Sequence, residues 1–564
     1  MARPCLAGCW LGTLLVLGAA LATGQDDDAT WRQRKARVQR ALQGDALDEK
    51  IEAVRELGSA DRPEAVDVLL QVLDWKVPKE KAIRDQKGRI EKELDAILDR
   101  VRTGSGRLTP AERNRYGTLN DELDKLHERL ATAAYLRRWA TLALQAMRDE
   151  AAHSRMIEAG LSHESLRVRT GVLTALRAIP AEASIPRIVA LLGDTDSRVR
   201  AAAAEALGVM GSAGPDGTAG DFAGKVRAAA RDELLGSLED PRWEVRSATV
   251  FALARWREAR VVEPIVNRMA SEGGRLIEDF DRALKELTGH TCQGQTSAWK
   301  SWLAAHRDRL EEIVAKREPT SDGEDDRTVI AFYGVRSRSK RIVFVVDCSK
   351  SMNEPAKNYI PQPPPPGSRP SRRVFSLSPE PTRLDVARYE LESAITALSD
   401  DSRFGVIAFH DRVGKASDNS RLEHTEEMGG LEVFQPDRLV AATGPEKDRA
   451  YRWLGALRAE GQTNLYEAVA RAFDPTGKGT PEDAVEDGPD SFFVLTDGVP
   501  TSGMIRRMDV ILSEVARWNV GRRIAIQVVG LEVPERAPGG SDPMRPAEFL
   551  RRLAEENGGE YGVR

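Results

Sequence analysis

The hydrophobic pattern of this chain changes its period once, and that change limits the possible folds more than any other feature. Up to about residue 310, apolar residues recur at the three- and four-residue spacing of amphipathic helices. After an acidic and polar stretch at 316–326, continuous β-branched runs alternate with helical segments. The sequence therefore predicts an all-α region followed by an α/β domain. The length of 564 residues also exceeds what one compact core holds.

Charge and composition exclude nucleic acid as a partner. The chain carries 83 Lys and Arg residues against 88 Asp and Glu residues, for a formal net charge of −5. This near balance provides no positive field that could hold a polyanion. With 30% charged and 5% aromatic residues, the composition favours helices with solvated surfaces.

The first 24 residues have the pattern of an export signal. Arg3 supplies a basic start, an apolar run extends from Leu11 to Leu21, and a small-x-small cleavage pattern ends at Ala22. We therefore expect residues 1–24 to be removed and the mature protein to be periplasmic or extracellular. No later stretch approaches the roughly 18 apolar residues of a membrane span, so no stable span is expected after cleavage.

Two cysteines remain once the signal is removed. Cys292 lies in a helical segment and Cys348 lies at a strand end, without the close Cys or His neighbours of a zinc site. The sequence favours two free thiols, with a single bridge between them as the alternative.

One helical motif occurs three times between residues 160 and 270. Each copy follows a polar turn and leads into valines, alanines and leucines on one helix face. The three motifs are Leu166-Arg167-Val168-Arg169, Ser197-Arg198-Val199-Arg200 and Trp243-Glu244-Val245-Arg246. Partner helices carry a proline near their start, at Pro63, Pro186 and Pro264. Because such a helix pair buries its apolar face only against neighbouring pairs, the pattern indicates an α-solenoid at 25–310.

An inserted antiparallel helical hairpin is expected at about 78–135. Two segments there place apolar residues at the alternating spacing of a coiled-coil seam. The seam residues are Ile83, Ile90, Leu94, Ile97 and Val101, then Tyr116, Leu119, Leu123, Leu126 and Leu130. Gly104 and Gly106 separate the segments, and Thr109-Pro110 supplies an N-cap and a first helical residue. The hairpin should project from the solenoid, either as a solvated spacer or as a partner-binding arm.

Buried strands are expected in the C-terminal part, after a linker at 311–337. Continuous apolar runs occur at 341–346, 404–409, 492–496 and 524–529. Helical patterns lie between these runs, so the order predicts a doubly wound sheet with helices on both faces at 338–564. Ligands of such sheets bind at the carboxyl ends of the strands.

Polar residues gather where these strands end. Asp347 ends the first run and begins the segment Asp347-Cys348-Ser349-Lys350-Ser351. Asp497 follows the run at 492–496, and Thr463 lies in a glycine-led loop that opens a helix. Two carboxylates and three hydroxyls form a hard, oxygen-only set that suits Mg²⁺, Mn²⁺ or Ca²⁺. The competing interpretation is a degenerate site whose carboxylates only cap loops.

These motifs resemble two known families. The repeated helix pairs resemble HEAT-like repeats, and 338–564 resembles the von Willebrand factor A (VWA) domain with its metal-ion-dependent adhesion site. The pairing of the two is similar to that of exported bacterial HEAT-repeat/VWA proteins. The resemblance implies Mg²⁺ as the first candidate cation and an acidic group of a partner as its remaining ligand.

The resemblance also implies a role for each residue of the set. Ser349 and Ser351 would ligate the metal through their hydroxyls, and Thr463 would ligate it directly or through water. Asp347 and Asp497 would hold it mainly through water and hydrogen bonds.

A proline-rich insertion at 355–381 departs from a minimal domain of this family. It contains four consecutive prolines, Pro363 to Pro366, which favour a stiff polyproline II segment. Its position after Ser351 places it beside the expected metal face. It could screen the site, extend the binding surface or be a surface insertion without a role.

The sequence therefore predicts a non-enzymatic, metal-dependent protein-binding or adhesion protein. Its VWA site would bind an Asp or Glu of a protein or surface ligand, and the solenoid would offer a second interaction surface. One alternative is a scaffold in which the solenoid recognises the partner and the VWA domain is structural. Another is metal-dependent phosphoester hydrolysis at Asp347, although Ser349 stands where phosphatases with a strand-end Asp nucleophile carry a second acid. The sequence assigns no catalytic or cofactor-binding residue and leaves the oligomeric state open.

Overall fold

A computed structural model describes most of the chain. The described residues are 28–103, 109–212, 220–316, 330–332, 335–357, 359, 374–410, 425–428, 431–434, 438–474, 481, 488–498, 500–536 and 544–563. The predicted export signal at 1–24 and the four consecutive prolines lie outside these residues. No helix within the described ranges has the length and apolar character needed to cross a bilayer.

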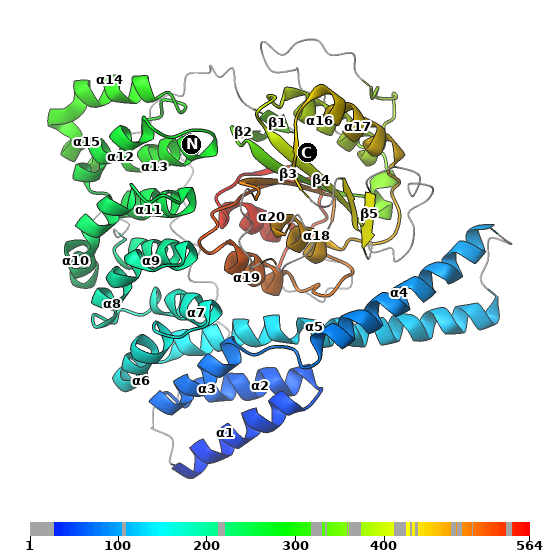
Figure 1. The fold of residues 1–564 in the computed structure, drawn as a ribbon, viewed down its shortest axis with the longest axis horizontal. Helices are drawn as coiled ribbons and strands as arrows, with labels where there is room; N and C mark the ends of the chain where they lie inside the picture. The colour runs from blue at the N-terminus through cyan, green and yellow to red at the C-terminus, as the bar shows by residue number, and fades with distance from the viewer. Residues whose placement is uncertain are drawn as a thin grey trace.

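The N-terminal region is an all-α solenoid that curves along one side of the C-terminal domain (Figure 1). Its helices are α1 (Asp28–Gln43), α2 (Leu47–Gly58), α3 (Pro63–Leu73), α4 (Glu80–Thr103), α5 (Pro110–Ala146), α6 (Glu150–Arg155), α7 (Leu166–Leu176), α8 (Ser184–Ala190), α9 (Ser197–Met210), α10 (Asp221–Ser237), α11 (Trp243–Trp256), α12 (Val262–Met269), α13 (Arg275–Thr288), α14 (Thr296–His306) and α15 (Leu310–Lys316). The predicted starts of α7, α9 and α11 are confirmed, and the last helix extends six residues into the predicted linker.

Arginines of the repeated motif tie each repeat to the next one. Arg169 of α7 pairs with Asp194 at 2.6 Å, in the turn before α9. Arg200 of α9 pairs with Asp240 at 2.7 Å, in the turn before α11. Arg246 of α11 continues the series with Glu272 at 2.6 Å. These partly buried pairs fix the stacking of successive helix pairs, in addition to the continuous apolar core.

The helical hairpin is present, and its second helix also belongs to the solenoid. Thr109 caps α5 with a capping box to Glu112, as the Thr-Pro pair predicts. Arg115 of α5 forms two bonds of 2.7 and 2.9 Å with Glu93 of α4, across the hairpin. Helix α5 then continues to Ala146 and contacts α2, α3 and α7. The inserted hairpin therefore ends within helix α5. The part of the hairpin that does not pack on the solenoid projects beyond both domains (Figure 1).

The C-terminal domain, residues 330–563, is built on a mixed sheet. Its elements are β1 (Ile330–Phe332), β2 (Val335–Ser337), β3 (Arg341–Asp347), α16 (Arg383–Ala397), β4 (Arg403–Phe409), β5 (Thr425–Met428), β6 (Leu431–Phe434), β7 (Val440–Ala441), α17 (Gly444–Ala456), α18 (Leu465–Phe473), β8 (Ser491–Thr496), α19 (Met508–Asn519), β9 (Ala525–Gly530), α20 (Pro546–Glu555) and β10 (Tyr561–Val563). The strand order is β10-β9-β8-β3-β4-β6-β5, with β7 also paired to β4. The strands from β10 to β4 are parallel, and β5, β6 and β7 add an antiparallel edge.

Alternate residues of the parallel strands feed two separate cores. On one face, Val343 and Val345 pack with α18, α19 and α20. On the other face, Phe344 and Val346 pack with α16 and α17. Because both faces are covered, the strands are apolar throughout, which explains the continuous runs in the sequence. Cys292 and Cys348 are not joined by a disulfide bond.

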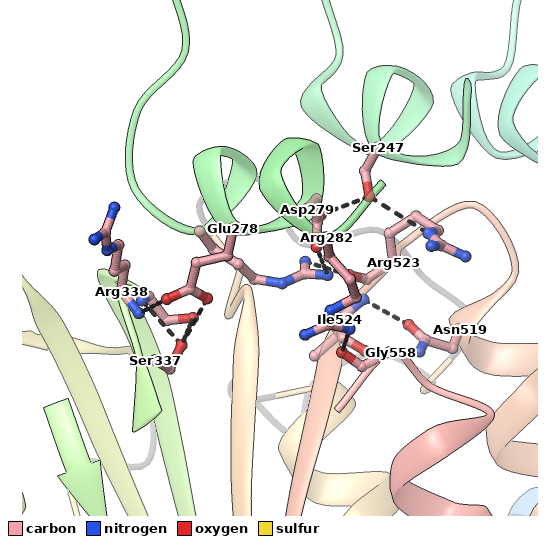
Figure 2. A network of polar contacts seen from close by, with 12 residues as sticks. Ser247, Glu278, Asp279, Arg282, Ser337, Arg338, Asn519, Arg523, Ile524 and Gly558 are labelled. Carbon is pink, nitrogen blue, oxygen red and sulfur yellow. Dashed lines mark hydrogen bonds and ion pairs between the residues drawn. The ribbon is translucent and has the colours of Figure 1, made fainter. Parts of the chain in front are cut away.

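Polar contacts join the solenoid to the amino ends of the parallel strands (Figure 2). Glu278 of α13 accepts from the backbone N–H of Arg338, just before β3. Arg523, just before β9, forms an ion pair of 3.1 Å with Glu205 of α9 and lies over the Phe251 ring of α11. Arg282 of α13 donates to the carbonyl of Gly558, just before β10. The C-terminal domain therefore packs against the inner helices of the solenoid, α9, α11 and α13.

A second contact runs along α5 and α19. Arg137 of α5 pairs with the buried carboxylate of Glu514 at 3.1 Å, and Arg138 pairs with Asp509 at 3.0 Å. Near the first contact, Gly521 has a φ of +68° and lies so close to α9 that a Cβ there would overlap the backbone of Arg198. Only glycine satisfies both the backbone conformation and the close approach at this position.

The buried Glu278 gives the domain contact a pH dependence. Burial raises its pKa to about 7, although Arg275, Arg282 and the Arg338 N–H oppose the shift. The folded state thus holds a proton that the unfolded state releases near its ordinary pKa, so the stability from this group is lost as pH rises from about 4.5 to 7. We predict that wild type loses thermal stability relative to Glu278→Gln over this range. Parallel profiles for wild type and Glu278→Gln would contradict the prediction, and the exposed Glu311→Gln serves as control.

Candidate metal site

The predicted site residues lie at the carboxyl edge of the sheet, where neighbouring strands end. Asp347 is the last residue of β3, and Ser349 and Ser351 follow it in a short turn. Asp497 comes directly after β8, which pairs with β3. Thr463 precedes α18, which packs on these strands. The topology therefore brings together segments that lie more than a hundred residues apart.

Asp347 is fully buried and held by both carboxylate oxygens. Its Oδ1 accepts from the backbone N–H of Ser349 at 2.8 Å. Its Oδ2 accepts from the hydroxyl of Thr496 at 2.6 Å. These bonds fix the orientation of the carboxylate and shape the turn that carries the two serines. Thr496 is a neighbour of the predicted set that the sequence did not single out, although it lies directly before Asp497.

The serines connect Asp347 to Asp497. The hydroxyls of Ser349 and Ser351 are 3.1 Å apart, and that of Ser351 donates to Oδ1 of Asp497 at 3.0 Å. Thr463 lies next to Gly498, the residue that follows Asp497. A Cβ atom added to Gly498 would be 3.7 Å from the hydroxyl oxygen of Thr463. The structure thus gathers the whole predicted set, four of them in one hydrogen-bonded chain.

Two buried carboxylates dominate the electrostatics of this site. Burial, and after it the nearby charge of Asp497, raises the pKa of Asp347 to about 7. Burial also raises the pKa of Asp497. Both shifts have burial as their first cause, because a carboxylate removed from water is less stable in its charged form. The residues fit a divalent cation, since oxygen is the donor type that Mg²⁺ and Ca²⁺ prefer. The described residues contain no cluster of three or more His, Cys, Asp or Glu side chains with metal-binding geometry.

Arg383 supplies a positive charge that the sequence did not reveal. It begins α16 beside Thr382, whose side chain caps that helix. Its guanidinium donates to Oδ2 of Asp497 at 2.8 Å and to Glu532 at 2.7 Å. The pair is almost fully shielded from water, with side-chain exposures of 10% for Arg383 and 1% for Asp497. One carboxylate of the site is therefore already paired with a buried guanidinium.

Two neighbouring segments hold the edges of the site. At the base of the proline-rich insertion, the backbone N–H of Lys357 donates to Glu532, the same carboxylate that binds Arg383. On the other side, the backbone N–H of Thr501 donates to the carbonyl of Thr463 at 3.0 Å. Three residues on, Met504 packs against the apolar cluster of the helical hairpin. The base of the proline-rich insertion thus contacts the carboxylate that binds Arg383, and the hairpin contacts the segment that follows Asp497.

Replacing Arg383 tests whether a cation can take its place. We predict that Arg383→Met lowers the free energy of unfolding in EDTA by about 3 kcal/mol, because Asp497 loses its buried partner. Saturating Mg²⁺ should reduce the difference in unfolding free energy between this variant and wild type, since the metal would supply the missing charge. Chemical unfolding with and without Mg²⁺ measures both effects. A difference in unfolding free energy that Mg²⁺ does not change would argue against a cation at Asp497. Arg449→Met, which breaks an exposed ion pair, is the control.

Comparisons with known proteins find similarity to two families. A family model described as HEAT repeats matches residues 123–214, which begin inside α5. The human von Willebrand factor A domain-containing protein 3A is 28% identical over 158 residues. That match spans 28% of this chain and 11% of the human protein. The chain thus has HEAT repeats in its N-terminal region and a VWA-like α/β fold in its C-terminal domain.

Two solved structures resemble parts of the molecule. A von Willebrand factor type A protein from Catenulispora acidiphila has a TM-score of 0.25 and 19% identity, covering 41% of this chain and 40% of its own. The complex of CpcE and CpcF of phycocyanin lyase from Nostoc sp. PCC7120 has a TM-score of 0.20 and 18% identity. That likeness covers 50% of this chain and 97% of the other.

Proposed function

We propose that this protein binds protein ligands through a divalent cation held at the carboxyl edge of the C-terminal domain. HEAT repeats and VWA domains are both features of proteins with interaction roles. The observation that carries the proposal is the chain of hydrogen bonds from Asp347 through Ser349 and Ser351 to Asp497. When bound, the cation would offer a coordination position to an Asp or Glu of the ligand. Mg²⁺ is the first candidate, with Mn²⁺ and Ca²⁺ as alternatives.

The position of the site supports a role in binding. The solenoid contacts the amino ends of the parallel strands, and the site lies at their carboxyl ends. A ligand could therefore reach the metal without displacing the solenoid. The protein would keep its domain arrangement while bound.

The environment of Asp347 argues against an enzyme with this residue as nucleophile. Both of its carboxylate oxygens accept hydrogen bonds from the protein, and the side chain is fully buried. A nucleophile needs a lone pair directed at the substrate, and neither oxygen is presented in that way. We therefore propose a non-enzymatic role for the site.

A scaffold in which the solenoid recognises the partner is the second candidate. The inner helices α9, α11 and α13 already contact the C-terminal domain through Arg523, Arg275 and Arg282. A partner of the solenoid would then bind the outer helices α8, α10 and α12 or the projecting hairpin. This arrangement makes the two candidates separable by substitution.

Cation binding is tested by thermal unfolding of the full chain. We predict that Mg²⁺ at about 100 times its dissociation constant stabilises wild type by about 2.7 kcal/mol relative to EDTA. The double variant Ser349→Ala/Ser351→Ala should lose this increment, because two direct ligands are removed. Ser393→Ala, which removes a hydroxyl on α16 away from the site, should keep it. Equal stabilisation of wild type and double variant, or none by Mg²⁺, Mn²⁺ or Ca²⁺, would refute the proposed site.

Ligand chemistry is tested by selecting displayed peptides on the full chain in Mg²⁺ and eluting them with EDTA. The selected peptides should be enriched in Asp or Glu, and a change of that residue to Asn or Gln should abolish binding. Peptides that remain bound in EDTA and to Ser349→Ala/Ser351→Ala would instead favour recognition by the solenoid.

A further inference from the structure

The backbone of Thr463 is held on both sides by the segment that follows Asp497. The N–H of Thr463 donates to the hydroxyl of Thr501 at 3.0 Å. Its carbonyl accepts from the backbone N–H groups of Thr501 and Ser502 at 3.0 and 3.2 Å. Both polar groups of the Thr463 backbone are therefore bonded to one short segment. The position of the Thr463 hydroxyl, a predicted metal ligand, depends on where that segment lies.

The same segment then enters the contact with the helical hairpin. Met504 packs against the apolar cluster of the hairpin and also against the apolar core of the C-terminal domain. Its backbone N–H lies 3.2 and 3.3 Å from the two carboxylate oxygens of Glu467 on α18, to which it donates. Gly503 has a φ of +90°, and a Cβ there would overlap Oδ1 of Asn464. Only glycine fits this turn, which brings Met504 to the hairpin.

The base of the hairpin contributes both charge and apolar side chains to this contact. Lys87 of α4 forms a largely buried ion pair with Glu91. Burial raises the pKa of Glu467, and the positive charge of Lys87 opposes that shift, so Lys87 acts on the carboxylate that accepts from Met504. On α5, Ala131 and Ala134 belong to the apolar core of the C-terminal domain. The base of the hairpin thus continues that core, while its tip projects beyond both domains (Figure 1).

We propose that the helical hairpin controls the cation affinity of the metal site, with Thr501 and Met504 as the residues that position Thr463. The inference rests on the proposed function, because it concerns the affinity of that same site. A ligand that is already fixed where it coordinates loses less conformational freedom when the cation binds. Coupling between two sites is reciprocal, so a bound cation should also stabilise the contact at the hairpin base. A hairpin that is only a spacer would have neither effect.

The first measurement needs no cation. Amide hydrogen exchange of the full chain in EDTA is followed by mass spectrometry in peptides that contain Thr501 and Ser502. We predict that Met504→Ala speeds exchange of these two amides by at least about tenfold, because the segment loses its apolar anchor. Met504→Leu, which keeps the apolar volume, should stay within about twofold of wild type. Met269→Ala, which leaves a cavity in α12 of the solenoid, is the control for a general loss of stability.

The second measurement is isothermal titration calorimetry of the full chain with Mg²⁺. Met504→Ala should weaken Mg²⁺ binding by at least about fivefold. Lys87→Ala, on the hairpin side of the contact, should weaken it in the same direction. Met504→Leu and Met269→Ala should bind Mg²⁺ like wild type. Lys81→Ala is the matched control for Lys87→Ala, because Lys81 is an exposed lysine of the same helix.

The two measurements separate this inference from the proposed function. Wild-type exchange at Thr501 and Ser502 in Met504→Ala, or equal Mg²⁺ affinity in wild type, Met504→Ala and Lys87→Ala, would overturn the inference and leave the metal site in place. A wild-type chain that binds none of Mg²⁺, Mn²⁺ and Ca²⁺ would overturn both. Circular dichroism establishes that each variant is folded. If Met504→Ala is unfolded, Lys87→Ala decides both measurements.

Discussion

Guanidinium groups form ion pairs and hydrogen bonds between the solenoid and the C-terminal domain, and the relative position of the two regions depends on these contacts. Arg137 and Arg138 bind α19 from the side, and Arg523 and Arg282 join the amino ends of the strands to the inner helices. Buried ion pairs of this kind tolerate little misplacement, because each lost partner leaves a charge without compensation. The solenoid has its own stacked helix pairs, and it also packs against the C-terminal domain through these ion pairs.

The two ends of the parallel strands also differ in charge. At the amino ends, a cavity between the two domains is lined by five arginines and by one acid, Glu244. At the carboxyl ends, Asp347 and Asp497 accumulate negative charge that Arg383 only partly balances. Arginines therefore predominate where the two domains meet, and carboxylates predominate at the free edge of the sheet. Both follow from one rule of α/β folds, in which strand ends carry the polar groups while strand interiors stay apolar.

Local patterns in the sequence predicted the parts of this structure that local physics decides. Continuous apolar runs located the long parallel strands, and Thr109-Pro110 located the start of α5. The candidate site residues were found because each follows a strand end or opens a helix. Arg383 was missed as a partner of Asp497 because it begins a helix, and no local pattern there indicates a contact with a residue 114 positions away. The docking of α5 on α19 was out of reach for the same reason, since its ion pairs join segments more than 350 residues apart.

A double-mutant cycle on Arg138 and Asp509 tests the docked arrangement most directly, because the cycle isolates one ion pair across the boundary. The free energy of unfolding would be measured in EDTA for wild type, Arg138→Ala, Asp509→Ala and the double variant. The docked arrangement predicts a coupling energy of about 1 kcal/mol between the two positions. Additivity within about 0.3 kcal/mol would contradict it, because residues that do not touch contribute independently.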